Sequence, residues 1–255
     1  MVLTYPILFT VAGVEFHTWG IFVTLGILAG VWLTIRLAKG SEFSSEKIQE
    51  FIMYGVVVGF LGGRAWEVLF SLGDYVNEPW RAFMLWQGGL SIQGAVAANV
   101  IFSWWFFHRE KLSYLKFADI AVPGLILGQA IGRIGCFFNG DAYGKPTDDW
   151  YGVIYKSGTS AFSAWGATPL VPAELMEAGL DIAILAVLLL VFKKRKFDGQ
   201  VGLTYFVLYS LIRFGLEFLR TDSFMVGNFK AAQITALATA FIASFIWLWK
   251  MNKVR

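Results

Sequence analysis

Seven long apolar stretches constrain this chain more than any other feature of its sequence. Each approaches the ~20 residues that a helix needs to cross ~30 Å of hydrocarbon. The stretches are Thr18–Leu37, Ile48–Leu69, Gly89–Phe107, Phe117–Phe138, Leu175–Phe192, Val201–Leu219 and Ala231–Trp249. None shows the period-two alternation of a barrel strand, so all seven are predicted helices. The predicted fold class is all-α: a polytopic integral membrane helical bundle that forms a single transmembrane domain over residues 1–255.

The composition agrees with a membrane protein. The chain is 57% hydrophobic and 15% charged, whereas charged residues make up about a quarter of an ordinary soluble domain. This excludes disordered, collagen-like and nucleic-acid-binding classes. The single cysteine, Cys136, excludes a disulfide framework, and His17 and His108 lie too far apart for a histidine metal motif. We therefore expect no metal, no cofactor and no nucleic-acid partner.

The basic residues between the stretches predict the orientation. Alternate connections carry 13 Lys and Arg on one side and 5 on the other. By the positive-inside rule, the N-terminus faces outward and the C-terminus is cytoplasmic. Residues 1–16 carry no Lys or Arg and no cleavage signature, so we expect no removable signal peptide.

Three arginines lie inside predicted spans: Arg64, Arg133 and Arg213. An arginine there costs at least ~2.5 kcal/mol on insertion scales, so each is a functional candidate. Their spans all run from inside to outside, and each arginine lies past the middle. Other polar residues of the spans and their outer ends fall at the same depth: Ser91, Gln93, Asn139, Asp141, Glu67, Glu174, Glu177 and Glu217. The pattern predicts a polar chamber open to the outer leaflet above an apolar cytoplasmic half.

Two interpretations of this chamber remain open on residue type alone. Buried charges usually need partners, so the arginines and carboxylates could form structural ion pairs. Arginine also grips phosphate through two parallel hydrogen bonds, which favours recognition of an anionic lipid head group. Glycine pairs four residues apart, such as Gly59 with Gly63 and Gly128 with Gly132, are more typical of helix packing than of a site. Cys136 is interpreted as a small core residue.

The run Gly132-Arg133-Ile134-Gly135-Cys136-Phe137-Phe138-Asn139-Gly140-Asp141-Ala142-Tyr143-Gly144 resembles the signature of prolipoprotein diacylglyceryl transferases, G-R-x-G-N-F-x-N-G-E-x-x-G. Further matching segments keep the family's order over essentially the whole chain: Gly63-Arg64, Gly88 to Gly94, Pro172 to Glu177, and Tyr209 to Phe214 with Glu217 and Arg220. The family also has seven spans and an outside N-terminus.

The resemblance implies transfer of an sn-1,2-diacylglyceryl group from phosphatidylglycerol to the lipobox cysteine of a preprolipoprotein, with release of glycerol phosphate. It implies a bacterial cytoplasmic (inner) membrane protein whose active site opens to the outer leaflet. Its partners would be phosphatidylglycerol, the preprolipoprotein signal peptide and membrane lipids. The implied catalytic residues are Arg133, Arg213, Glu217 and Tyr209; the implied substrate-binding residues are Arg133, Arg64, Gln93, Asn139, Asp141, Gly144, Glu174 and Arg220.

The chain departs from the family pattern at several positions. Gln93 stands where many members have a histidine, a candidate base for the thiol, and an amide is no useful proton acceptor. Trp19 replaces a tyrosine, Cys136 the signature asparagine and Asp141 the signature glutamate. The base is thus unassigned, with Asp141, Glu174 and Glu217 as candidates.

Two further hypotheses remain. A transporter or flippase for an anionic lipid or phosphate metabolite would also carry intramembrane arginines, although the sequence shows no inverted repeat. A non-catalytic lipid-binding relative is the other. Residues 139–174 are expected to form an outer-face loop or a small head element over the chamber. Acyl-chain preference, lipoprotein range and oligomeric state are not determined by the sequence.

Overall fold

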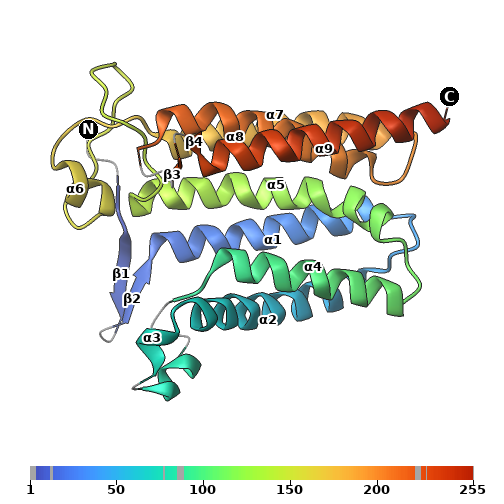
Figure 1. Ribbon diagram of the computed structural model, residues 1–255, viewed down its shortest axis with the longest axis horizontal. Coiled ribbons are helices and arrows are strands. Elements are labelled where there is room, and N and C mark those ends of the chain that lie inside the picture. The colour runs from blue at the N-terminus through green and yellow to red at the C-terminus, as the bar shows by residue number, and fades with distance from the viewer. Residues whose placement is uncertain are drawn as a thin grey trace. The chain divides into compact units, whose positions relative to one another are not determined.

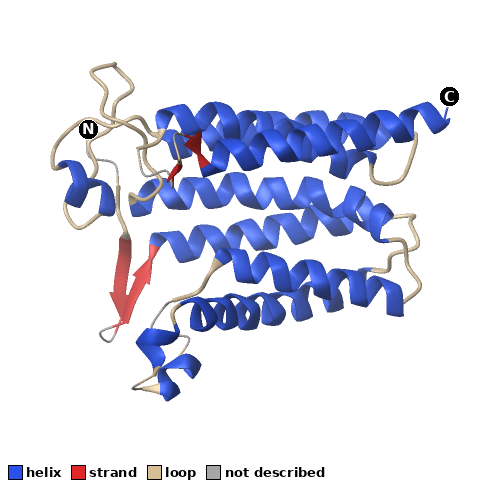
Figure 2. Ribbon diagram, in the orientation of Figure 1, coloured by secondary structure: helices blue, strands red, loops and turns tan. Residues whose placement is uncertain are grey.

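The computed structural model describes residues 4–11, 14–76, 78–84, 89–221, 225–227 and 229–254. It contains long helices, two small hairpins and connecting loops, the longest of which carries a short helix (Figure 2). The long helices are α1 Thr18–Ala38, α2 Ser45–Phe70, α4 Ile92–Arg109, α5 Tyr114–Asn139, α7 Ala173–Lys194, α8 Gln200–Leu216 and α9 Ala231–Val254. Shorter helical segments are α3 Leu72–Tyr75, η1 Pro79–Phe83, α6 Ser160–Trp165 and η3 Glu217–Leu219. Every predicted stretch thus corresponds to a helix.

Six of these helices, counted over the described residues, are long and apolar enough to cross a membrane: α1, α2, α5, α7, α8 with η3, and α9. The third predicted stretch appears as α4, which is 18 residues long and is not among the six. Besides apolar residues, α4 contains the polar residues Gln93, Asn99, Ser103, His108 and Arg109, which lower its mean hydropathy. Asn99 and Ser103 donate to carbonyls of their own helix, at 3.0 and 2.6 Å. The prediction of a helical membrane protein with several spans is therefore confirmed, and the seventh span stays a prediction.

Two hairpins were not expected from the sequence. Strands β1 Ile7–Val11 and β2 Val14–His17 pair antiparallel, and Phe9 stacks on Phe16 with ring centroids 4.7 Å apart. Strands β3 Met225–Val226 and β4 Phe229–Lys230 pair in the same way. Both lie in connections that precede a long helix, where β-branched and aromatic residues favour extended backbone.

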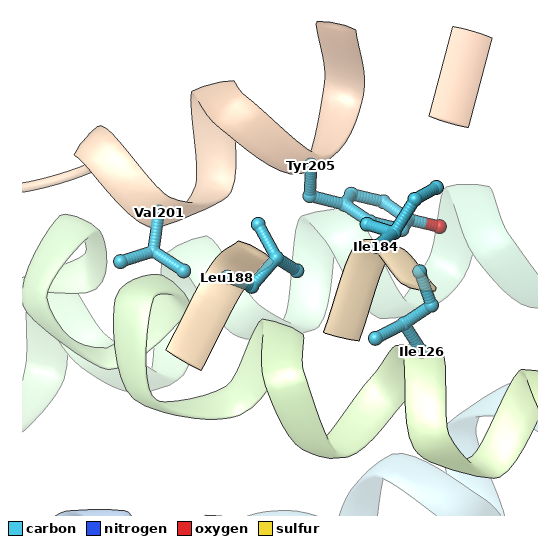
Figure 3. Packing of buried hydrophobic residues seen from close by; sticks show 5 residues of the cluster. All are labelled: Ile126, Ile184, Leu188, Val201 and Tyr205. Atoms are coloured by element: carbon cyan, nitrogen blue, oxygen red, sulfur yellow. The ribbon is translucent and has the colours of Figure 1, made fainter. Parts of the chain in front are cut away.

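The chain forms two compact units. The larger unit comprises Met1–Arg36 and Ala118–Arg255, and in it α1 lies beside α5 while α7, α8 and α9 run side by side (Figure 1). A Cβ on Gly26 of α1 would lie 2.7 Å from the Gly128 carbonyl oxygen of α5, so only glycine permits this approach. Packing between α5, α7 and α8 buries Ile126, Ile184, Leu188, Val201 and Tyr205 (Figure 3).

The smaller unit comprises Leu37–Phe117 and contains α2, α3, η1 and α4. Helices α2 and α4 pack through small residues, with Gly62 of α2 facing Gly94 and Ala98 of α4. Phe51 stacks on Phe102 at a centroid distance of 5.5 Å, and Phe107 contacts Phe117 at 4.5 Å. This aromatic packing holds one end of the unit together.

Candidate functional site

The centre of the candidate site is an ion pair between two long helices of the larger unit. Arg133 Nη2 on α5 lies 2.9 Å from Glu177 Oε1 on α7. The Arg133 side chain is 22% exposed and that of Glu177 is 3% exposed, so the carboxylate is enclosed while the guanidinium keeps an open edge. An ionised carboxylate buried in this way needs a cation and donors nearby.

Helix α8 supplies the other partners of this carboxylate. Tyr209 Oη donates to Glu177 Oε1 at 3.0 Å, and Arg213 Nη1 lies 3.9 Å from Glu177 Oε2. Arg213 Nη2 also pairs at 3.0 Å with Glu217 Oε2, on η3 one helical turn later. Because Tyr209, Arg213 and Glu217 are spaced four apart, they share one face of α8 and η3. We call Arg133, Glu177, Tyr209, Arg213 and Glu217 the ion-pair cluster.

The four predicted catalytic residues thus all lie in this cluster. The residue that joins them, Glu177, was expected only as a polar group of the chamber, while Glu174 was the implied site residue of that segment. The three-residue spacing of the two glutamates at the head of one helix was the available signal, since it puts both on one side of α7.

Glu174 has a different environment. It is 1% exposed, and Tyr155 Oη donates to its two carboxylate oxygens at 3.1 and 3.0 Å. The Arg220 guanidinium adds a favourable electrostatic interaction. Burial and the nearby Glu174 carboxylate raise the pKa of Tyr155 well above its usual range, so this tyrosine stays a neutral donor. The bond ties the loop before α6 to the first turn of α7.

The end of α5 presents a second polar group. Asn139 Nδ2 donates to Asp141 Oδ2 at 2.6 Å, and the Cys136 thiol interacts with Asp141 and with the Trp19 indole of α1. Gly140 between them has φ +69°, which lets the chain turn out of the helix. The signature residues from Arg133 to Asp141 therefore belong to one helix end and its cap.

Gly144 allows three chain segments to meet. A Cβ there would lie 2.8 Å from the Val171 carbonyl oxygen and 3.0 Å from that of Leu219. The Gly144 N–H donates to Val171 at 2.8 Å, and Gly144 pairs with Arg220 in a β-bridge. Lys230 Nζ donates to the Glu217 and Arg220 carbonyls at 2.6 and 2.7 Å. Gly144 and Lys230 thereby fix the backbone after the cluster.

Arg64 and Gln93 belong to the smaller unit. The Arg64 guanidinium donates to the carbonyls of Ala82 and Gly89, both at 2.9 Å, and to that of Arg81. The Arg64 residue is 7% exposed. Ser91 Oγ donates to Gln93 Oε1 at 2.8 Å. Gly88, part of the same predicted motif, lies outside the described residues.

The ion-pair cluster balances two guanidiniums against two carboxylates. Both arginines keep about a fifth of their side chain exposed, and Arg213 Nη1, which is itself buried, has no hydrogen-bond acceptor among the described residues. Arginine donors of this kind suit a tetrahedral oxyanion better than a metal ion or a neutral ligand. The arrangement can hold an anion and stabilise charge that develops on it.

Comparisons with known proteins point to one family. A family model described as prolipoprotein diacylglyceryl transferase matches residues 6–249. A phosphatidylglycerol–prolipoprotein diacylglyceryl transferase of Gloeobacter violaceus is 35% identical, over 97% of this chain and 93% of that protein. The protein of the same name from Finegoldia magna is 34% identical, over 96% of this chain and 95% of that protein. The one from Thermotoga maritima is 36% identical, over 89% of this chain and 78% of that protein.

Proposed function

The chain belongs to the prolipoprotein diacylglyceryl transferase family, and we propose that its ion-pair cluster carries out the transfer that the names of its relatives describe. The donor is phosphatidylglycerol, and the acceptor is the lipobox cysteine of a preprolipoprotein. One observation carries the assignment of the site: Arg133 and Arg213 share the buried Glu177 carboxylate. Both guanidiniums retain exposed surface for a phosphodiester.

The reaction balances as a substitution at carbon. The acceptor sulfur forms a C–S bond to the terminal carbon of the diacylglyceryl group, and the C–O bond to phosphate breaks. The thiol loses its proton, and glycerol phosphate leaves with one more negative charge than the phosphodiester carried. Arg133 and Arg213 stabilise that developing charge. Glu177 and Tyr209 hold Arg133, while Glu217 holds Arg213.

Of the three candidate bases, we propose that Asp141 removes the proton of the acceptor thiol. Glu174 and Glu217 are each 1% exposed and already bound, the first to Tyr155 and the second to Arg213. Asp141 is partly exposed, and its side chain interacts with those of Asn139 and Cys136. A base must reach the proton that it removes, so accessibility favours Asp141. Asn139 orients its carboxylate.

The membrane arrangement is also part of the proposal. We infer seven spans with α4 as the third, an outward N-terminus and a cytoplasmic C-terminus in the bacterial inner membrane. The cluster then lies at outer-leaflet depth, where the donor phosphate resides. Residues 139–174, which include α6 and the Tyr155–Glu174 contact, form the outer-face head element. The distribution of basic residues supports this orientation.

The decisive experiment mixes purified protein with phosphatidylglycerol vesicles and a lipobox peptide. The product is scored as the mass of a diacylglyceryl thioether on the peptide. Product is expected with the wild type and is expected to vanish with Arg133→Ala. Arg195→Ala is the matched control, because Arg195 is exposed and stacks on Phe192 away from the cluster. No product from folded wild-type protein that binds phosphatidylglycerol would favour the non-catalytic relative or the transporter.

A further inference from the structure

A second polar layer lies one helical turn from the ion-pair cluster. Gln129 of α5, Asp181 of α7 and Tyr205 of α8 are each four residues away from a cluster member, namely Arg133, Glu177 and Tyr209. The helices α5, α7 and α8 therefore bring polar side chains together at two successive levels, one helical turn apart. We call Gln129, Asp181 and Tyr205 the second layer. Of its three members, Tyr205 also belongs to the buried hydrophobic core, where Figure 3 shows it beside Ile184.

Hydrogen bonds run through this layer in one direction. Tyr205 Oη donates to Gln129 Oε1 at 3.2 Å, which leaves the Gln129 amide nitrogen to donate. Gln129 Nε2 donates to Asp181 Oδ1 at 3.4 Å. The Tyr205 ring stacks on that of Tyr209, with centroids 5.5 Å apart and an interplanar angle of 11°. The two layers are thus in direct contact through the tyrosines.

Asp181 is poorly supported as an anion. It is 0% exposed, its Oδ1 has one long hydrogen bond, and its Oδ2 has no partner among the described residues. Asp119 of α5 shows the contrast: it is equally buried, but accepts from the backbone N–H groups of Gly199, Val201 and Gly202 at 2.8, 2.8 and 3.1 Å. Three donors at a helix N-terminus stabilise a carboxylate, whereas a single long one does not.

The charged and titratable groups that face Asp181 reinforce this difference. Glu177 lies one turn away on α7, Arg133 is on α5, and Tyr205 and Tyr209 are on α8. Arg133 is already committed to Glu177 at 2.9 Å. Two carboxylates on one buried helix face cannot both ionise without a second cation. Glu177 has the cation, so the proton belongs to Asp181.

We propose that Asp181 holds a proton, and that this proton sets the affinity of the ion-pair cluster for an anionic phosphodiester. Arg133 and Arg213 balance Glu177 and Glu217, so the cluster meets an incoming anion without net charge when Asp181 is neutral and with a net negative charge when Asp181 is ionised. An ionised Asp181 adds a like charge one turn away and opposes the anion. Asp181 is therefore a positioning residue: it acts on the anion through the charge of the cluster and does not touch the substrate. The inference rests on the proposed function only in taking phosphatidylglycerol as the anion.

The test measures binding separately from catalysis. Purified wild-type protein and Asp181→Asn are titrated with short-chain phosphatidylglycerol in detergent, at neutral and alkaline pH. Asparagine mimics the neutral acid, so neutral-pH affinity should be unchanged. The affinity of the wild type for phosphatidylglycerol should be about tenfold lower at alkaline pH than at neutral pH. This is the effect of an ionised carboxylate ~10 Å from the lipid phosphate at an effective dielectric constant of ~20. The affinity of Asp181→Asn should be the same at both pH values.

Infrared difference spectra supply a direct readout. The wild type minus Asp181→Asn spectrum should contain the carbonyl stretch of a protonated carboxylic acid, and wild type minus Asp119→Asn should not. The inference would be overturned if Asp181→Asn bound phosphatidylglycerol more weakly than the wild type at neutral pH, or if its affinity fell at alkaline pH as much as that of the wild type. Absence of the carbonyl band would also overturn it. Absence of thioether product in the peptide assay, with this binding behaviour intact, would overturn the transferase proposal alone.

Discussion

Glu177 Oε1 accepts a hydrogen bond from Tyr209 and lies 2.9 Å from Arg133 Nη2, so one buried oxygen joins α5, α7 and α8. Its partner oxygen faces Arg213 at 3.9 Å. The positions of both proposed phosphate-binding arginines therefore depend on a carboxylate that does not itself face the substrate. Conservative changes around it give the sharpest tests of the site.

Glu177→Gln should reduce kcat/KM for the lipobox peptide about a hundredfold, the effect expected when a reacting group is misplaced by ~1 Å. The amide keeps the size of the side chain and removes the charge that holds Arg133. Steady-state assays with phosphatidylglycerol vesicles measure the effect. Glu42→Gln, which weakens a surface pair with Lys116 at 3.4 Å, should leave the rate unchanged. A wild-type rate in Glu177→Gln would refute this role.

Gly144→Ala should destabilise the protein by about 1–3 kcal/mol, the usual cost of overpacking a tight contact. Its Cβ would meet the Val171 and Leu219 carbonyls, which are backbone atoms that cannot step aside. Thermal unfolding in detergent measures the loss. Gly179→Ala is the matched control, because no atom lies within 4 Å of a Cβ there and alanine favours a helix interior. Equal melting temperatures for the two variants would contradict the prediction.

Asp119→Ala should lower stability by at least the ~1–2 kcal/mol typical of a lost helix cap. The change removes the acceptor for the first N–H groups of α8, at Gly199, Val201 and Gly202. The melting temperature should fall while the KM for phosphatidylglycerol stays the same. Asp148→Ala, at an exposed position of the head segment, serves as the comparison. A raised KM without a change in melting temperature would place Asp119 in the site instead.

Tyr155→Phe should cost about 1–3 kcal/mol, because the buried Glu174 carboxylate loses the hydrogen bond that the Tyr155 hydroxyl shares between its two oxygens. The pH dependence has a defined sign. Since the pKa of Tyr155 is raised by burial in the folded protein, the unfolded chain releases this proton first, near pH ~10. Wild-type stability should therefore fall above about pH 10 as Tyr155 contributes to the slope. Unfolding midpoints of Tyr155→Phe should show a smaller alkaline decline, and an identical slope would argue against it.

Arg64→Lys should lower the melting temperature of the protein, and its effect on the KM for phosphatidylglycerol tests the implied role of Arg64 in substrate binding. Lysine cannot reproduce the planar guanidinium that reaches the carbonyls of Arg81, Ala82 and Gly89 together. Arg133→Lys provides the contrast, with a raised KM and little loss of stability. If Arg64→Lys raised the KM as strongly as Arg133→Lys, Arg64 would be assigned to substrate binding, as the family resemblance implies.

The sequence by itself determined the helices and the candidate residues of the site. Twenty-residue apolar stretches have few alternatives in a membrane, since every backbone group must be bonded within its segment. Observed boundaries follow from this: the stretch Thr18–Leu37 became α1 Thr18–Ala38, and Ala231–Trp249 became α9 Ala231–Val254. Arginine is costly in a span, so the positions of Arg133 and Arg213 alone made them candidate site residues.

Only the tertiary structure decided how these residues are paired. Periodicity gives the face of a helix but not its neighbour, so the sequence could not show that Glu177 joins Arg133 to Arg213. For the same reason it could not separate two aspartates of equal burial: Asp119 has three backbone donors and Asp181 has one long bond from Gln129. The charge state of a buried group depends on the donors and cations that other helices bring to it, and that arrangement exists only after the helices have packed.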